Sequence, residues 1–184
     1  MKTAAPTLDF SKLRIVPLPS PTNTVFADFR SGEPEIDKNL GKCCDWHGCY
    51  RSRVFCAYFD GDSALYGFYC LGLHAHDSKM AATLFVRPND DDRGYVPFIY
   101  LHYLAVREGW RRKKIGTMLL VHALERCAIV IRNIGSYGVA LNALNEDAIA
   151  LYDNHGFRIP KAAEKMAHPT MILPAQTLFD LFGA

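Results

Sequence analysis

Two groups of residues in the second half of this 184-residue chain are suited to chemistry on a phosphorylated substrate. The first is a run of four consecutive cations, residues 111–114, followed closely by Gly116. If a helix begins there, its free backbone N–H groups and the positive end of its dipole point toward these cations, which favours phosphate binding. The second is Tyr152, a phenol that keeps its proton at neutral pH and can act as an acid.

The predicted elements place both groups along one path of the chain. Residues 98–106 are nearly all apolar or aromatic, which indicates a strand buried on both faces. Apolar residues recur at helical spacing over 115–129, and 139–144 indicates another strand. A short helix is predicted over 146–154, with Gly156 as its stop. We therefore expect a strand, a cationic turn, a helix, a second strand and a second helix.

Each of these residues also has a purely structural interpretation. Short charge runs are usually solvated, so residues 111–114 could be the exposed start of a helix. Asn145 could do no more than cap the helix that follows it, and Tyr152 could be a core residue with a satisfied hydroxyl. The ordered set of elements favours a functional role, although each residue taken singly is compatible with both interpretations.

The spacing around the second helix resembles that of the GNAT superfamily of acetyl-CoA-dependent N-acetyltransferases. Residues 145–157 fit the family pattern Asn-x-x-Ala-x-x-Leu/Phe-Tyr-x-x-x-Gly-Phe at every defined position. Residues 104–106, Leu-Ala-Val, resemble the strand whose backbone pairs with the pantetheine arm of the cofactor. The cationic turn resembles the family pattern Arg/Gln-x-x-Gly-x-Gly/Ala, except that Lys114 replaces the first glycine.

This resemblance implies an α/β GNAT fold, in which helices flank a central mixed and mostly antiparallel sheet. It also implies a splay between two central strands, around Leu104 and Leu141, that holds the pantetheine arm of the co-substrate acetyl-CoA. Tyr152 takes the role of catalytic acid. The residues to which the resemblance gives cofactor-binding roles are Leu104, Val106, Arg111, Arg112, Lys113, Lys114, Ile115, Gly116, Thr117 and Asn145.

Lys114 is the departure that bears on cofactor binding. In one interpretation its Cβ crowds the pyrophosphate and resists a positive φ, a backbone conformation that suits glycine. In the other, the turn adopts a right-handed helical conformation that tolerates lysine and adds a favourable charge.

The chemistry of acetyl transfer can be compared with the residues directly. The reaction requires a neutral amine, a polarised carbonyl and a stabilised leaving thiolate, and tyrosine suits the last task because its pKa lies near that of a thiol. No His–Asp or Cys–His pair has a local spacing typical of covalent catalysis, so direct attack by the amine is the simpler hypothesis. An α-amino group, with a pKa of roughly 7.7–8.0, needs little help from a base. Glu108 is the one nearby carboxylate considered as a base, and its alternative role is that of a surface-turn residue.

Further segments resemble the GNAT toxins of bacterial type II toxin–antitoxin systems, namely residues 29–40, 50–55 and 169–178. The chain departs from that branch in having no cysteine before Gly32, and in having Tyr103 where the branch usually has arginine. Members of the branch acetylate the amino acid on charged tRNA and are neutralised by a ribbon-helix-helix antitoxin. The resemblance therefore implies aminoacyl-tRNA as the acceptor and such an antitoxin as a partner, with a homodimer as a further option.

Charge gives only modest support for an RNA substrate. The chain has 21 Lys plus Arg and 19 Asp plus Glu, a formal net charge of +2, whereas dedicated RNA-binding proteins are usually more basic. Arg51, Arg53 and Arg93 are the candidate RNA contacts, because they could form a one-sided basic rim with residues 111–114. Each arginine has the alternative of ending a solvated strand or loop.

Length and composition indicate a single domain over residues 1–184, with 49% hydrophobic residues and no repeat. Residues 1–23 are proline-rich at their end and are expected to be extended. No apolar run is long enough to span a membrane, so a cytoplasmic protein is the default expectation. The cluster of Cys43, Cys44 and Cys49 matches no standard zinc spacing, so no metal is expected.

The remaining elements are predicted as a helix over 34–48, a hairpin of strands 53–59 and 65–71, and a strand over 80–87. His74 and His76 either share one face of an extended segment or lie in a loop after the hairpin. The predicted function is acetyl-CoA-dependent N-acetylation of aminoacyl-tRNA. Two alternatives stay open: a GNAT enzyme for a small-molecule amine or a protein amino group, and a catalytically inactive CoA-fold module that binds a protein.

Overall fold

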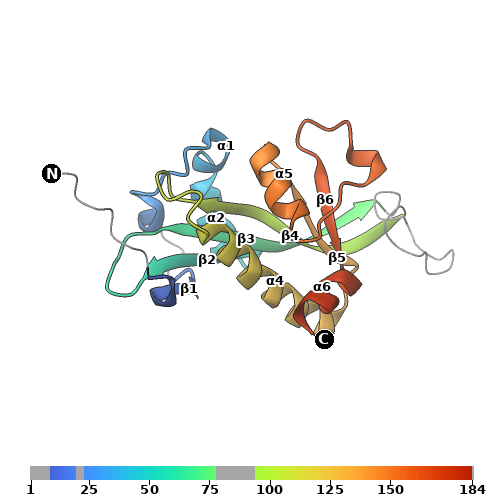
Figure 1. The fold of residues 1–184 in the computed structure, drawn as a ribbon, viewed down its shortest axis with the longest axis horizontal. Coiled ribbons are helices and arrows are strands. Elements are labelled where there is room, and N and C mark those ends of the chain that lie inside the picture. Colours follow the sequence, from blue (N-terminus) through green and yellow to red (C-terminus); the bar gives the residue numbers. More distant parts are fainter. Residues whose placement is uncertain (1–8, 20–22, 78–93, 184) are drawn as a thin grey trace.

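The computed structural model describes residues 9–19, 23–77 and 94–183. Within these ranges, six strands form one sheet in the order β1-β2-β3-β4-β5-β6 (Figure 1). Neighbouring strands are antiparallel except β4 and β5, which are parallel, so the predicted mixed and mostly antiparallel sheet is confirmed. The strands are β1 (Leu13–Pro17), β2 (Ser52–Phe59), β3 (Gly67–Asp77), β4 (Tyr95–Val106), β5 (Gly138–Asn142) and β6 (Thr170–Pro174).

Helices cover both faces of this sheet. The longest helix, α4, crosses one face, and α6 lies beside it near the C-terminal end (Figure 1). The helix α2 packs on β2 over the other face. The described helices are α1 (Pro34–Asp37), α2 (Leu40–Gly48), α4 (Ile115–Ile134), α5 (Glu146–Asp153) and α6 (Ala175–Phe182), with short 3₁₀ turns η1 (Phe10–Lys12), η2 (Asn23–Phe26) and η3 (Lys161–Ala163).

Two apolar clusters hold the helices to the sheet. Leu119, Leu120 and Leu124 of α4 are almost fully buried among β-sheet residues, and each contributes about 2 kcal/mol of hydrophobic stabilisation. On the opposite face, Phe29 and Phe68 pack edge-to-face beneath α2 and η2, with ring centroids 5.4 Å apart. One face of α4 is therefore buried against the sheet from Ile115 to Ile131, which fixes the start of the helix.

The parallel strands β4 and β5 separate soon after they pair. Pairing is limited to Ile99 with Val139 and Tyr100 with Ala140, whereas β4 continues to Val106 and β5 to Asn142. This separation is the predicted splay between the two central strands. From residue 101 onward, one edge of β4 has no neighbouring strand in the described structure.

A β-bulge in β4 lies where this splay begins. Cys70 pairs with Tyr103, but Leu71 pairs with Leu101, so His102 is an extra residue with no partner in β3. Gly72 leaves room for it, because a Cβ at Gly72 would lie 2.6 Å from the His102 ring nitrogen. The bulge changes the direction in which the following β4 side chains point.

The predicted continuous helix over 34–48 is wrong, because the chain breaks it into α1 and α2. Asn39 donates its side-chain amide to the Glu35 carbonyl at 2.7 Å, while its backbone N–H bonds Ile36 instead. This competition for helical carbonyls ends the first helix. The strand predicted over 80–87 lies outside the described residues.

Several other predicted boundaries shift. The helix predicted over 115–129 continues to Ile134, five residues beyond its predicted end. The 3₁₀ turn η1 interrupts the N-terminal segment, residues 1–23, expected to be extended. Strand β3 runs on to Asp77, so the loop interpretation of His74 and His76 is wrong. Their rings lie on one face of the strand with centroids 4.9 Å apart.

Candidate active site

The splay opens into a cleft of about 640 Å³. One wall is the unpaired stretch of β4, residues 101–106, and the other is the end of β5 with the start of α5. Arg111, Tyr152 and His168 line it from three separate parts of the chain. The cleft therefore has a basic end beside α4, a strand edge along its length, and a phenol in its wall.

The basic end is the cationic turn that leads into α4. Lys114 is the N-cap of the helix, so the first backbone N–H groups of α4 have no acceptor within the helix. The Arg112, Lys114, Gly116 and Thr117 positions line the cleft together with Arg111. Free N–H groups, the helix dipole and exposed cations thus meet where a phosphate could bind.

Lys114 itself adopts a left-handed conformation, with φ +64° and ψ −4°. The right-handed alternative is therefore wrong, and the turn has the backbone expected of a glycine at this position although a lysine occupies it. Arg112, two residues earlier, also has a positive φ of 58°. A left-handed conformation costs a non-glycine residue roughly 1–2 kcal/mol, so the turn is strained at both positions.

The side chains of Lys113 and Ile115 point away from the cleft. The Lys113 ammonium lies over the Trp110 ring, 4.3 Å from its centroid, and Ile115 is 1% exposed within the core. Neither side chain lines the cleft. Only their backbone N–H groups remain available for the role of holding phosphate.

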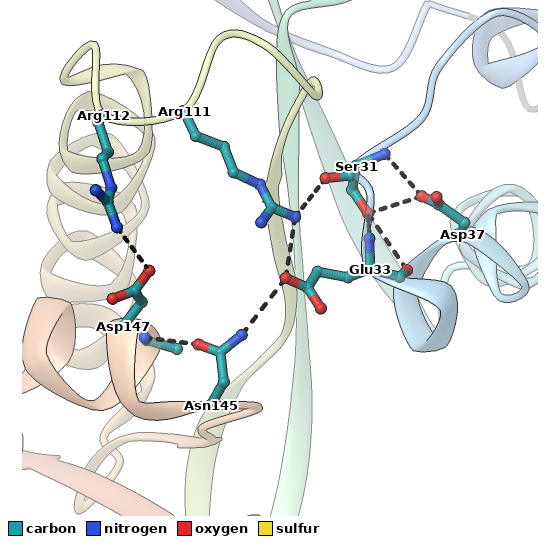
Figure 2. Close-up of polar contacts among 8 residues, drawn as sticks. Ser31, Glu33, Asp37, Arg111, Arg112, Asn145 and Asp147 are labelled. Atoms are coloured by element: carbon teal, nitrogen blue, oxygen red, sulfur yellow. Dashed lines mark hydrogen bonds and ion pairs between the residues drawn. The ribbon is translucent and has the colours of Figure 1, made fainter.

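Arg111 is engaged by acidic and carbonyl oxygens across the cleft. Its Nη2 lies 3.0 Å from Glu33 Oε1 and also donates to the Ser31 carbonyl (Figure 2). The segment that carries Glu33 is fixed by Asp37, whose Oδ1 accepts from Ser31 N at 2.8 Å and from Ser31 Oγ at 2.7 Å. The neighbouring Arg112 faces Asp147 at 3.6 Å, with both side chains largely exposed.

Asn145 connects the other wall to the same carboxylate. Its side-chain oxygen accepts from Ala148 N at 3.0 Å, which confirms the predicted helix cap. Its side-chain amide donates to Glu33 Oε1 at 3.5 Å (Figure 2). Glu33 therefore bridges Arg111 and Asn145, two residues to which the sequence assigns cofactor contacts.

Tyr152 lies in the cleft wall with 7% of its surface exposed. Its ring packs against Phe157, with centroids 5.6 Å apart. Burial raises the pKa of the Tyr152 phenol above its ordinary value, so its proton is retained at neutral pH. The expectation that its pKa lies near that of a thiol is wrong, because desolvation of the phenolate makes Tyr152 a weaker acid than an exposed tyrosine.

Two carboxylates and an imidazole that the sequence did not single out also line the cleft. Glu33, Glu35 and His168 all line the cleft, whereas Glu108 does not. His168 Nδ1 lies 3.1 Å from the Leu144 carbonyl, and its Nε2 lies 3.7 Å from Glu35. No local motif marks these residues, since His168 is more than 100 positions from Glu33 and Glu35 and meets them only in the fold. Glu108 is an exposed turn residue whose backbone N–H donates to Arg30 at 2.8 Å.

Two of the three candidate RNA contacts, Arg51 and Arg53, lie over aromatic rings. Arg51 lies over the Trp46 ring at 4.7 Å and Arg53 over the Tyr50 ring at 4.8 Å, with both arginines exposed. Neither lines the cleft directly. Arg93 lies outside the described residues.

The cysteine and histidine clusters have structural explanations. Cys43 and Cys44 lie on the buried face of α2 and Cys49 is exposed, and all six cysteines are free. His47 accepts a hydrogen bond from Val54 N at 3.1 Å. Within the described ranges, no group of three His, Cys, Asp or Glu side chains could hold a metal ion. None of the helices in these ranges combines the length and hydrophobicity required of a membrane span.

Comparison with known families identifies the fold and the enzyme class. The acetyltransferase (GNAT) domain family matches residues 50–159, more than half of the chain. The chain belongs to the GNAT acetyltransferases. The match includes β4, the cationic turn, α4 and the Tyr152 helix, so this GNAT domain contains the whole basic end of the cleft and its phenol. The predicted fold and enzyme class are confirmed.

Individual relatives of this GNAT protein include a tRNA-acetylating toxin. The chain is 35% identical over 134 residues to a tRNA-acetylating toxin of Mycobacterium tuberculosis, covering 71% of this chain and 76% of the relative. A structure of AtaTR bound with AcCoA has a TM-score of 0.75 and 21% identity, covering 94% of this chain and 99% of that one. AtaT complexed with acetyl-methionyl-tRNAfMet has a TM-score of 0.72 and 19% identity, covering 92% and 99%.

Proposed function

We propose that this GNAT protein transfers the acetyl group of acetyl-CoA to the α-amino group of an aminoacyl-tRNA. The observation that carries the proposal is the 35% identity to a tRNA-acetylating toxin over most of both chains. The structural relatives that contain AcCoA or acetylated tRNA support the same donor and acceptor. The site residues of this chain provide an independent physical argument.

The basic end of the cleft fits the donor. The left-handed Lys114 leads directly into the start of α4, where the free N–H groups form a phosphate cradle, and Gly116 lines the cleft within the first turn. The unpaired edge of β4 offers the backbone groups of Leu104 and Val106 to a pantetheine arm, and Asn145 lies opposite. When bound, acetyl-CoA would supply an activated acetyl thioester in this cleft.

Tyr152 is the residue placed to assist departure of the thiolate. Its raised pKa keeps the phenol protonated, so the hydroxyl can donate a hydrogen bond to sulfur as negative charge develops there. The same raised pKa makes complete proton transfer less favourable than for an exposed phenol. A hydrogen bond that stabilises the developing charge on sulfur is therefore the main contribution of Tyr152.

The acceptor requires little assistance from a base. An α-amino group has a pKa of roughly 7.7–8.0, so a substantial minority is neutral at cellular pH and can attack directly. Glu35 and His168, which line the same cleft, are available to accept the proton that the amine releases. A covalent acetyl-enzyme intermediate is not required.

A test of this proposal compares acceptors under identical conditions. Purified protein is incubated with labelled acetyl-CoA and charged tRNA, with deacylated tRNA, or with free amines and peptides. Label on charged tRNA alone supports the proposal, and label on amines or peptides but not on charged tRNA contradicts it. Absence of acetyl-CoA binding in calorimetry would instead favour the catalytically inactive module.

The toxin resemblance also leads us to propose a ribbon-helix-helix antitoxin as a partner. Co-expression with the adjacent reading frame, followed by co-purification and loss of acetylation, is the corresponding test. Growth arrest relieved by that reading frame is expected, and arrest that persists would contradict the pairing.

A further inference from the structure

A cluster outside the cofactor end of the cleft places two cations on one aromatic ring. Lys42 Nζ lies 4.9 Å and Arg51 Cζ lies 4.7 Å from the centroid of the Trp46 ring. Lys42 is one turn before Trp46 on α2, and Arg51 lies in the connection from α2 to β2. We refer to Lys42, Trp46 and Arg51 as the Trp46 clamp.

The two charges of the Trp46 clamp are held in place without being neutralised. In the described part of the chain, neither Lys42 nor Arg51 forms an ion pair, whereas Arg14, Arg111 and Arg158 each pair with a carboxylate. A carboxylate partner would cancel the charge that it positions. A cation–π contact fixes the cation through the ring quadrupole and leaves its full charge for an anionic ligand.

The Trp46 clamp lies against the end of the cleft that is remote from the cationic turn. The Trp46 ring packs on His102 and Tyr103, at centroid distances of 5.0 Å and 6.4 Å, and both of these residues line the cleft. The β4 backbone runs from His102 to Val106 over about 13 Å before the cationic turn begins. If the donor phosphates occupy the turn, an acceptor must approach from the other end, where the Trp46 clamp lies.

Aromatic rings continue the Trp46 clamp along the sheet. The Tyr100 ring lies 4.9 Å from that of His102, and His74 lies 5.3 Å from Tyr100. Burial, with smaller effects of His74, Arg51 and Lys42, lowers the pKa of His102 to about 4, so this ring is uncharged at neutral pH. Two cations beside a row of aromatic rings match a strand of unpaired nucleotides, whose phosphates are anionic and whose bases stack.

We propose that the Trp46 clamp binds the phosphodiester backbone at the unpaired 3′ end of an RNA, so that the aminoacyl group enters the cleft past Tyr103. The proposal rests on the proposed function for the identity of the acceptor. An acidic peptide would share the attraction to Lys42 and Arg51, but carboxylates gain nothing from the row of rings. The observations therefore favour RNA.

The experiment measures direct binding of a short uncharged RNA ending in CCA, by fluorescence anisotropy over a range of salt concentrations. The double variant Lys42→Gln/Arg51→Gln is expected to bind about tenfold more weakly. Its slope of log K against log salt should fall by about 1.4, since each phosphate contact on a single strand contributes about 0.7. Trp46→Leu should bind the RNA more weakly than the unmodified protein. Trp46→Phe, which keeps an aromatic ring, should retain most of the affinity for RNA.

Arg132→Gln is the matched control, because Arg132 makes the same kind of contact with Phe179, at 5.8 Å, on the far end of α4. It is expected to bind RNA as the unmodified protein does. The affinity for acetyl-CoA, measured on every variant, reports on the fold. Lack of RNA binding by the unmodified protein, unchanged binding by the double variant, or equal competition by a poly-glutamate peptide would each overturn the proposal.

The two proposals fail separately. Because the RNA probe is uncharged, the Trp46 clamp is tested whether or not acetylation occurs. RNA binding that depends on Lys42 and Arg51, without acetylation of charged tRNA, would support the Trp46 clamp and contradict the acceptor assignment. Acetylation of charged tRNA with the same KM in the double variant would support the proposed function and overturn the role of the Trp46 clamp.

Discussion

The carboxylate of Glu33 lies 3.0 Å from the guanidinium of Arg111, so the first cation of the cationic turn already has an anionic partner. The same oxygen accepts from Asn145 on the opposite wall. A phosphate that binds Arg111 must therefore compete with Glu33 or share the guanidinium with it. Glu33 is the residue before α1. Its carboxylate links Arg111 at the basic end of the cleft to Asn145 on the opposite wall.

Replacing Glu33 with glutamine is expected to strengthen acetyl-CoA binding. Glu33→Gln keeps the size of the side chain but removes the charge that competes for Arg111. Partly exposed ion pairs contribute up to about 1 kcal/mol, so the Kd should fall by about two- to fivefold in calorimetry. Glu35→Gln is the control, since Glu35 faces His168 rather than Arg111. Weaker binding by Glu33→Gln would instead mean that Glu33 holds Arg111 in its binding position.

Lys114→Gly is expected to stabilise the protein, because glycine adopts the left-handed conformation without strain. Relief of roughly 1–2 kcal/mol is partly offset by the greater flexibility of glycine in the unfolded chain. The net gain of about 0.5–1 kcal/mol should raise the Tm by about 1–4 °C. Lys113→Gly is the control, because it removes the same charge at a position without a positive φ. With no backbone strain to relieve there, it should lower the Tm. Equal shifts in the two variants would rule out backbone strain at Lys114.

Tyr152→Phe is expected to lower kcat by about a hundredfold or more while leaving the Kd for acetyl-CoA unchanged. The variant removes the hydroxyl that lies in the cleft wall but keeps the ring that packs on Phe157. Tyr95→Phe, at a position 70% exposed and outside the cleft lining, serves as the control. Turnover that survives the loss of the Tyr152 hydroxyl would assign thiolate stabilisation to another group.

The stability of the fold should decline in acid partly because of His102. Its pKa is lowered from 6.5 to about 4 in the folded state, mainly by burial, so the unfolded chain binds the proton more readily. The contribution is fully present above pH 6.5 and is lost as the pH falls toward 4. In His102→Phe, denaturant unfolding should show a shallower decline over this range. The same decline in both proteins would contradict the lowered pKa of His102.

The parts of the site that the sequence predicted are those encoded by short contiguous patterns. Asn145 caps α5 and Gly156 ends that region with a φ of +88°, both as their spacing indicates. Tyr152 follows from the same local pattern. The order of elements from β4 to α5 was likewise predictable, because a buried strand, an amphipathic helix and their turns each have a local periodicity.

The remaining parts depend on contacts between distant segments. Glu33 and His168 carry no signal of their own, and only the folding of the segments before α1 and before β6 brings them to the cleft. The break between α1 and α2 depends on whether Asn39 bonds its own helix, which composition does not decide. The ion pair between Arg111 and Glu33 likewise depends on the tertiary fold. The cationic turn that carries Arg111 is, by contrast, visible in the local sequence.

The separation of β4 from β5 leaves the hydrogen-bond ladder of the sheet interrupted in its middle. A molecule that pairs with this edge acts as a temporary seventh strand, and it can do so only when the chain is folded. Ligand present at a hundred times its Kd would then add about 2.7 kcal/mol to the free energy of unfolding. If acetyl-CoA is that ligand, its concentration in the cell helps to decide how long each copy of this protein survives proteolysis.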